Sequence, residues 1–300
     1  MLSINIPVYN TIIDRLVLSL HKQAEKLNIP FEIRIYDDGS SEQIKLHNRG
    51  LKELSNVEYV ELKENVGRAV IRNKMGFDSN FEWLLFIDSD SEIVQEDYLE
   101  KYLKIREHNR ISCGGTIYST EQPLSDKKLL RWKYGTAREA ISAEIRNKQK
   151  GFIITSNNFI IEKKVFVGTH FRDEIKGYGH EDTLFGFDLY KNGVEILHVD
   201  NPVMHTGLED ASSFLEKSKS ALKNLFFILE NMNHEKDEFS CKVRFLDSYN
   251  KIIRFINPAI LRLFYKIFGL SIEKNLKGRN PSLFWFDVYK LTYYSSIKKP

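Results

Sequence analysis

Over the first hundred residues, two hydrophobic patterns alternate along the chain. Short apolar runs typical of buried strands are separated by segments in which apolar residues recur every three or four positions, as on one face of a helix. Strands are expected at 2–8, 31–36, 57–62 and 83–87, and helices at about 12–27, 42–54, 65–75 and 96–108. This alternation predicts an α/β fold with a mostly parallel central sheet flanked by helices.

The pattern becomes less regular after residue 108 and mainly helical after about residue 211. Asn257-Pro258 is typical of a helix start and Gly269 of a helix end, so we expect a helix between them. There is no internal repeat or low-complexity linker, and we predict a domain over 1–215 and a helical extension over 216–300. Before that extension we expect a strand over 111–118, a polar stretch over 121–150, a strand over 152–162, a helix over 181–192 and an extended segment over 195–199.

Charge is unevenly distributed along the chain. The net charge is +3, yet residues 242–300 carry twelve Lys and Arg against three Asp and Glu, whereas residues 1–241 carry 32 basic and 38 acidic residues. The tail is also rich in aromatic residues. Basic, aromatic helices often lie at the surface of anionic bilayers, but a helix packed on the body with solvated lysines has the same composition. Nucleic acid is not an expected partner, because the body is acidic and no recognition motif is present.

Composition restricts the class of protein. The chain is 42% hydrophobic and 28% charged, which is typical of a folded protein, and no run of about 18 apolar residues suggests a membrane-spanning helix. Cys113 and Cys241 lie far apart, and the N-terminus enters a strand pattern without a signal-like segment. We therefore expect a cytoplasmic protein, peripheral at the inner face of the cell membrane if the tail contacts lipid.

Two carboxylates follow the strand predicted at 83–87. Asp88 and Asp90 come directly after a continuous apolar run, at the strand end where open α/β sheets bind their ligands. Paired carboxylate oxygens suit Mg²⁺ or Mn²⁺, and a metal so placed can hold a diphosphate. The alternative interpretation is an ordinary acidic turn.

Other polar residues occur at or near the ends of neighbouring strands. Asp37 and Asp38 follow the second strand, where a carboxylate can accept a hydrogen bond from a base or a ribose, or can simply form a turn. Arg68 and Arg72 lie one helical turn apart on the same face. Either could offset the charge of a diphosphate, or both could be ordinary solvated arginines.

The order of these segments resembles glycosyltransferase family 2, whose inverting members have a GT-A, Rossmann-like fold. The resemblance covers roughly residues 2–208 and depends on four segments: 4–10 (INIPVYN), 36–41 (YDDGSS), 65–73 (NVGRAVIRN) and 86–90 (FIDSD). It implies a nucleoside pocket, a metal site and a space for the donor sugar. The implied residues are Pro7, Tyr9, Asp38 and Arg72 for the nucleotide, Asp90 for the metal, Asp88 for the ribose or the metal, and Gly114 and Gly115 for the sugar, although close strand packing would explain these glycines equally well.

A second segment, 177–188 (GYGHEDTLFGFD), resembles the Gly-aromatic-Gly-x-Glu-Asp element of β-1,4-galactosyltransferases and chondroitin polymerases. The resemblance implies that Tyr178 and Asn158 contact the acceptor sugar and that Glu181 and Asp182 serve catalysis, with Asp182 as general base. Acidic residues at a helix start also complement its dipole without any catalysis. His180 departs from the pattern, in which a small residue is usual.

His205 follows an extended segment at the position where the resembled enzymes complete their metal site. An imidazole with carboxylates and phosphate oxygens would suit Mn²⁺, or Mg²⁺ in its place, whereas a lone histidine is more often structural.

Together these features predict a metal-dependent inverting glycosyltransferase. The resemblance implies a nucleotide-sugar donor, a UDP-sugar first, with transfer of a hexosyl or N-acetylhexosaminyl group to a saccharide or lipid-linked saccharide. One alternative is a catalytically silent nucleotide-sugar-binding subunit. Another is a nucleotidyltransferase, but residues 1–38 contain no glycine for a phosphate-binding loop after the first strand.

Overall fold

A computed structural model describes residues 1–149, 152–175 and 177–298. The chain forms two compact units. The first contains Met1–Ser119, Glu139–Glu174 and Glu181–Gly207, and the second contains Thr120–Arg138, Ile175–His180 and Leu208–Pro300.

This division corrects the predicted boundary between residues 215 and 216. Helix α9 (Ala211–Asn231) runs through that point without a break. The second unit also takes in an earlier segment, because Leu130 packs in one cluster with Phe214, Ile272 and Phe286.

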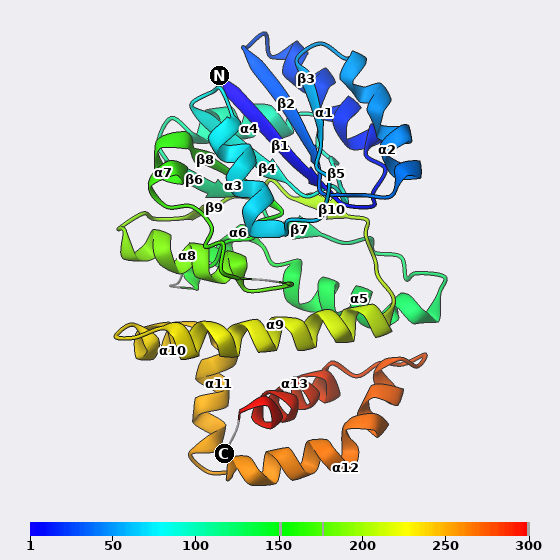
Figure 1. The fold of residues 1–300 in the computed structure, drawn as a ribbon, viewed down its shortest axis with the longest axis vertical. Coiled ribbons are helices and arrows are strands. Elements are labelled where there is room, and N and C mark those ends of the chain that lie inside the picture. Colours follow the sequence, from blue (N-terminus) through cyan, green and yellow to red (C-terminus); the bar gives the residue numbers. More distant parts are fainter. Residues whose placement is uncertain (150–151, 176, 299–300) are drawn as a thin grey trace. The chain divides into compact units, whose positions relative to one another are not determined.

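The first unit is built on a twisted, mostly parallel sheet (Figure 1). Within the described residues its strand order is β3-β2-β1-β4-β8-β6-β9, in which β8 runs antiparallel to both of its neighbours. The α/β architecture predicted from the sequence is confirmed. The strands are β1 (Leu2–Val8), β2 (Phe31–Asp37), β3 (Val57–Glu61), β4 (Trp83–Ile87), β6 (Ile111–Cys113), β8 (Asn158–Glu162) and β9 (Leu197–His198).

Helices cover both faces of this sheet. Leu85 and Ile87 of β4 pack with α1 (Asp14–Lys26) and α4 (Tyr98–Ile105) on one face. Leu84 and Phe86 pack on the other face, in a cluster that includes residues of α3 (Arg68–Asp78), α7 (Lys163–Gly168) and α8 (Glu181–Lys191). Because successive strand residues point to opposite faces, a strand covered on both sides needs the continuous apolar run seen here. The shorter helices of this unit are α2 (Glu42–Asn48), a 3₁₀ turn (Arg49–Glu53) and α6 (Ala143–Lys148).

A smaller sheet lies beside the carboxyl end of β4. Its order is β5-β10-β7, formed by Ser91–Glu92, Val203–His205 and Thr116–Ile117. The strand predicted over 111–118 is therefore two strands, β6 and β7, in different sheets. Gly115 between them has a φ of 84°, in the left-handed region that favours glycine.

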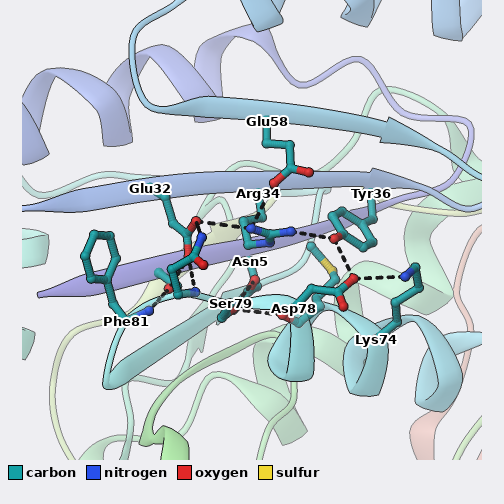
Figure 2. A network of polar contacts seen from close by, with 12 residues as sticks. Asn5, Glu32, Arg34, Tyr36, Glu58, Lys74, Asp78, Ser79 and Phe81 are labelled. Carbon is teal, nitrogen blue, oxygen red and sulfur yellow. Dashed lines mark hydrogen bonds and ion pairs between the residues drawn. The ribbon is translucent and has the colours of Figure 1, made fainter.

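A polar network fills part of the space between β1–β3 and α3 (Figure 2). Its centre is the buried Arg34, which donates to Glu32 at 3.1 Å and to the Tyr36 hydroxyl at 2.7 Å and contacts Glu58 at 2.8 Å. Tyr36 in turn donates to Asp78 of α3. A buried guanidinium is tolerated here because carboxylates and a hydroxyl surround it.

Helices make up most of the second unit. α13 packs on α12, α9 and α5, with α12 on the other side of α13 from α9 (Figure 1). Asn257 accepts a hydrogen bond from the Ala259 amide, which confirms the predicted start of α12. Gly269 was predicted as its end, but the helix continues to Leu276, and Gly269 is buried against the ring of Tyr265. The principal helices are α5 (Leu129–Tyr134), α10 (Lys236–Lys242), α11 (Arg244–Ile253), α12 (Pro258–Leu276) and α13 (Leu283–Ile297).

Among the described residues, no single helix has the length and apolar character needed to cross a membrane. One bent pair, α11 with α12, meets the criteria of length and composition only when the two are taken together across a bend of 108°.

Candidate active site

The small sheet brings Asp90 and His205 together. β10 pairs antiparallel with β5 so that His205 lies opposite Ser91, and the Thr206 amide donates to the Asp90 carbonyl at 2.8 Å. The His205 Nδ1 atom is 3.5 Å from Asp90 Oδ1. Gly207 allows this approach, because a Cβ there would lie 2.6 Å from Asp90 Oδ2. A carboxylate and an imidazole thus lie side by side at one end of the sheet.

Asp88 faces a different set of groups. Its Oδ1 accepts from the buried Arg72 guanidinium at 2.5 Å, and its Oδ2 is 3.6 Å from Arg68. Asp88 is therefore paired with arginine, whereas Asp90 lies beside an imidazole, and the metal role predicted for Asp88 stays a prediction. Asp88 anchors the charged cluster at the amino-terminal end of α3.

The same two arginines contact the start of α8. Glu181 Oε1 lies 3.5 Å from Arg68 and 4.0 Å from Arg72, and the Glu181 side chain is buried. The resemblance implied a catalytic role for Glu181, and the structure places its side chain in this cluster. Asp88 and Glu181 share Arg68 and Arg72 as partners. The end of β4 and the start of α8, almost a hundred residues apart in sequence, are therefore close in space.

Arg72 and Arg68 differ in accessibility, and this corrects the assignment of Arg72 to the nucleotide. The side chain of Arg72 is 1% exposed and that of Arg68 is 41% exposed. Only Arg68 can therefore reach a soluble anion. The sequence does not show which charged residues are buried, so the exposed Arg68 and the buried Arg72 could not be distinguished from the sequence alone.

Asp182 is half-buried at the first turn of α8 and accepts from the Thr183 amide at 2.7 Å. Burial, followed by the neighbouring Glu181 carboxylate, raises the pKa of Asp182 to about 6; the positive charges of Arg68 and Arg72 oppose that rise. A carboxylate with a pKa near neutrality is suited to accept a proton from a hydroxyl group.

The segment before α8 belongs to the second unit, where α9 holds it. Asn224 of α9 donates to the carbonyls of Tyr178 at 3.2 Å and Gly179 at 3.1 Å. Gly179 has a φ of 97°, and a Cβ there would lie 2.5 Å from that of Ala221. Lys217 covers one face of the Tyr178 ring, 5.0 Å from its centroid. Asn224 was not identified from the sequence, where an asparagine within a helical pattern carries no signal.

His180 also has a left-handed backbone, with a φ of 68°. This conformation costs free energy for any residue with a Cβ.

The expected nucleoside residues lie at the carboxyl ends of parallel strands. Pro7 is half-buried near the end of β1, Tyr9 beyond it is 53% exposed, and Asp38 follows β2. Asp38 is buried and accepts from the amides of Val66 at 2.7 Å and Gly67 at 3.2 Å. Burial raises its pKa, against the lowering effect of these two hydrogen bonds. Asp38 therefore holds the loop that leads into α3.

Asn158 is fully buried, and its side chain is satisfied from within the protein. Its amide nitrogen donates to the carbonyls of Gly115 and Asn201, and its oxygen accepts from the hydroxyls of Tyr98 and Tyr102. It links the two sheets instead of facing an acceptor, which corrects its predicted role.

Close packing also accounts for Gly114 and Gly115. A Cβ on Gly114 would lie 2.2 Å from the Asn201 carbonyl oxygen, and one on Gly115 would lie 2.6 Å from the Arg146 guanidinium. Neither glycine opens a space for a sugar, so the packing alternative is the one that the structure favours.

The donor set at this end of the sheet consists of two side chains. No group of three or more His, Cys, Asp or Glu side chains with metal-binding geometry occurs in the described part of the chain. Asp90 and His205 nevertheless provide an oxygen and a nitrogen donor side by side. Magnesium and manganese commonly complete their coordination with phosphate oxygens and water, so two protein ligands fit such an ion.

Comparison with known proteins identifies the family. The model of "Glycosyl transferase family 2" matches residues 3–167, which is more than half of the chain. No curated protein matches the sequence.

Solved structures share the fold at low sequence identity. S. aureus TarS 1–349 in complex with UDP-GlcNAc is 18% identical with a TM-score of 0.54, covering 92% of this chain and 79% of that one. The mannosyltransferase PcManGT from Pyrobaculum calidifontis, in complex with GDP-Man and Mn²⁺, is 12% identical with a TM-score of 0.60, covering 98% and 85%. Glucosyl-3-phosphoglycerate synthase from Mycobacterium tuberculosis, with Mn²⁺ and UDP, is 14% identical with a TM-score of 0.51, covering 78% and 81%. The first unit has a GT-A-like fold, and the chain belongs to glycosyl transferase family 2.

Proposed function

We propose that the protein is a metal-dependent inverting glycosyltransferase that uses a nucleotide-diphosphate sugar, with a UDP-sugar as the first candidate. The observation that carries the proposal is the shared arginine pair. Arg68 and Arg72 contact both Asp88 and Glu181. This supports the proposal that Asp90 and Asp182, which are close to those two residues in sequence, act in one site of the first unit.

Each residue has a role that follows from its surroundings. Asp90 and His205 would hold Mn²⁺ or Mg²⁺, and the bound ion would stabilise negative charge on the departing diphosphate. Arg68 is exposed enough to offset further phosphate charge. Pro7, Tyr9 and the loop held by Asp38 lie where the nucleoside would bind, at the carboxyl edge of the sheet.

Asp182 would act as general base. It takes the proton of an acceptor hydroxyl while that oxygen bonds to the anomeric carbon and the bond from this carbon to the diphosphate breaks. A single displacement of this kind inverts the configuration. Tyr178, three residues before Glu181, would stack on the acceptor sugar through its aromatic ring.

The nucleotides and nucleotide sugars bound in related structures support a nucleotide-sugar donor. TarS was crystallised with UDP-GlcNAc, PcManGT with GDP-Man, and the synthase with UDP. We therefore propose transfer of a hexosyl or N-acetylhexosaminyl group to a saccharide or lipid-linked saccharide.

Nucleotide release with a panel of UDP- and GDP-sugars, with Mn²⁺ and with chelator, tests the proposal. The wild type should release nucleotide only with metal and acceptor, and Asp182→Asn should keep donor binding while losing turnover. The control is Glu195→Gln, an exposed carboxylate of the same unit. Donor binding with no turnover by the wild type on any acceptor would instead favour a silent nucleotide-sugar-binding subunit.

A further inference from the structure

Helix α12 of the second unit has apolar residues on both of its sides. Leu261, Ile272 and Leu276 are buried and face the unit. The opposite side carries a stripe spaced by three or four residues, which places its members on one face of the helix. We call this stripe the outer face; its residues are Ile260, Leu263, Ile267 and Leu270, exposed by 60%, 56%, 58% and 83%.

Large aromatic side chains lie exposed near both ends of α12. Phe255 precedes the helix and is 89% exposed, and Phe284 and Trp285, at the start of α13, are 67% and 40% exposed. Solvent-exposed aromatic residues flanking an apolar helical face are unusual on a fully hydrated surface, and they are typical of segments that lie at a lipid interface.

The sequence around the outer face is mainly basic, although Arg279 pairs with Asp126 and Lys277 with Glu273. Glu273 is the only acidic residue between positions 248 and 286. Its side chain is turned toward the unit, where it contacts Lys219 at 3.1 Å and accepts from the Tyr289 hydroxyl at 2.5 Å. Exposed Lys266 and Lys274 lie one turn from Leu263 and Leu270 on the outer side. The remaining basic residues between those positions are Lys251, Arg254, Arg262, Lys277 and Arg279.

We propose that the outer face of α12 binds the surface of an anionic lipid bilayer, with the helix parallel to the membrane plane. The four aliphatic side chains would enter the boundary between headgroups and acyl chains, and the lysines would remain among the headgroup phosphates. An acidic lipid surface is the occupant that the charges favour, because a protein partner would need a large apolar surface ringed by acidic residues. The proposal is independent of the catalytic residues in the first unit.

Co-sedimentation of the full chain with vesicles tests the proposal. Vesicles of phosphatidylcholine mixed with phosphatidylglycerol should bind the protein, and phosphatidylcholine alone should bind it much more weakly. Leu263→Gln combined with Ile267→Gln should lower the partition coefficient at least about tenfold, because both side chains leave the apolar layer. Lys266→Gln combined with Lys274→Gln should lower it by about fivefold per lysine, and less at high salt.

Two matched control variants distinguish binding by the outer face from nonspecific adsorption of the protein to vesicles. Leu124→Gln removes an equally large, fully exposed apolar side chain elsewhere in the second unit, and Lys148→Gln removes an exposed lysine of the first unit. Both should bind like the wild type. Absence of binding to anionic vesicles, or binding unaffected by the Leu263/Ile267 pair, would overturn the proposal.

Light scattering without lipid completes the test. If the wild type is a dimer that the Leu263/Ile267 pair dissociates, and vesicles do not bind, the occupant is a second copy of this chain and the lipid proposal is wrong. A wild type of unchanged size over a range of concentrations, together with vesicle binding, supports it.

Discussion

Individual carboxylates at the carboxyl edge of the sheet have different surroundings, and these surroundings separate their roles. Asp88 is paired with arginine, Asp90 lies beside an imidazole, and Asp182 is desolvated next to another carboxylate. The sequence identified all three residues. It did not reveal the pairing of Asp88 with arginine or the burial of Asp182, because only the fold brings helix α3 to the end of β4 and to the start of α8.

The pH dependence of turnover should report Asp182. A general base works only when deprotonated, so kcat/KM should fall about tenfold per pH unit below an apparent pKa of about 6. Turnover by Asp182→Asn should be about 100- to 10,000-fold lower and should lack this acidic limb. A limb that persists in the variant would show that another group titrates.

The substitution Asp182→Asn, which should lower turnover, should raise the stability of the folded protein. The pKa of Asp182 is raised in the folded state from an ordinary 3.8 to about 6, so its ionised form destabilises the fold at pH values above that range. Asp182→Asn should therefore raise the free energy of unfolding by about 3 kcal/mol near pH 8, and the gain should disappear near pH 4. Urea unfolding at both pH values measures it. A loss of stability near pH 8 would contradict this account of the site.

At the scale of elements, the sequence predicted most of the first unit correctly and missed where strands change sheet. β1, β2 and β4 appear where the apolar runs predicted them. The strand expected over 111–118 breaks because Gly115 takes a left-handed conformation, and the strand expected from residue 152 begins only at Asn158. In both segments the apolar residues continue beyond the residues that pair in the sheet, so the hydrophobic pattern alone could not predict where the strands begin and end.

Helix α9 should affect acceptor use through Asn224. Asn224→Ala removes two hydrogen bonds to the Tyr178 and Gly179 carbonyls, and should lower the free energy of unfolding by about 1–2 kcal/mol. Because Tyr178 is proposed to contact the acceptor, KM for acceptor should rise while KM for the donor stays unchanged. Asn231→Ala, in the same helix but exposed, is the matched control. Equal changes in both KM values would indicate a general loss of structure.

The network around Arg34 connects β2 with β3 and, through Tyr36, with α3, and should contribute to stability (Figure 2). Arg34→Leu leaves Glu32 and Tyr36 without their buried partner and should cost about 2–3 kcal/mol. Arg110→Leu breaks a more exposed pair with Glu162 and should cost less than about 1 kcal/mol. Chemical denaturation compares the two variants, and similar losses would contradict a specific role for the network.

At the scale of the whole molecule, the division into units was the least predictable feature. Residues 120–138 are polar in sequence, yet Leu130 and Tyr134 pack with Phe214 and Phe286 of the second unit. Such long-range packing leaves no local pattern. The charge asymmetry of the tail was visible in the sequence, but only the structure shows that Glu273 turns inward and leaves one side of α12 basic and apolar.

Ligand binding should stabilise the whole chain only when metal and nucleotide are both present. When the UDP concentration is about one hundred times its dissociation constant in the presence of Mn²⁺, binding should add about 2.7 kcal/mol to the free energy of unfolding. Asp90→Asn combined with His205→Ala should abolish this gain in thermal unfolding. A gain that persists in the double variant would place the metal elsewhere.

The most direct measurement is a crystal structure of the protein with Mn²⁺ and an unreactive UDP-sugar analogue. We predict that Asp90 and His205 coordinate the ion, that the diphosphate lies beside Arg68, and that an Asp182 oxygen faces the anomeric carbon from the side opposite the leaving group. An ion bound away from Asp90 and His205, or an Asp182 carboxylate turned away from the sugar, would contradict the account.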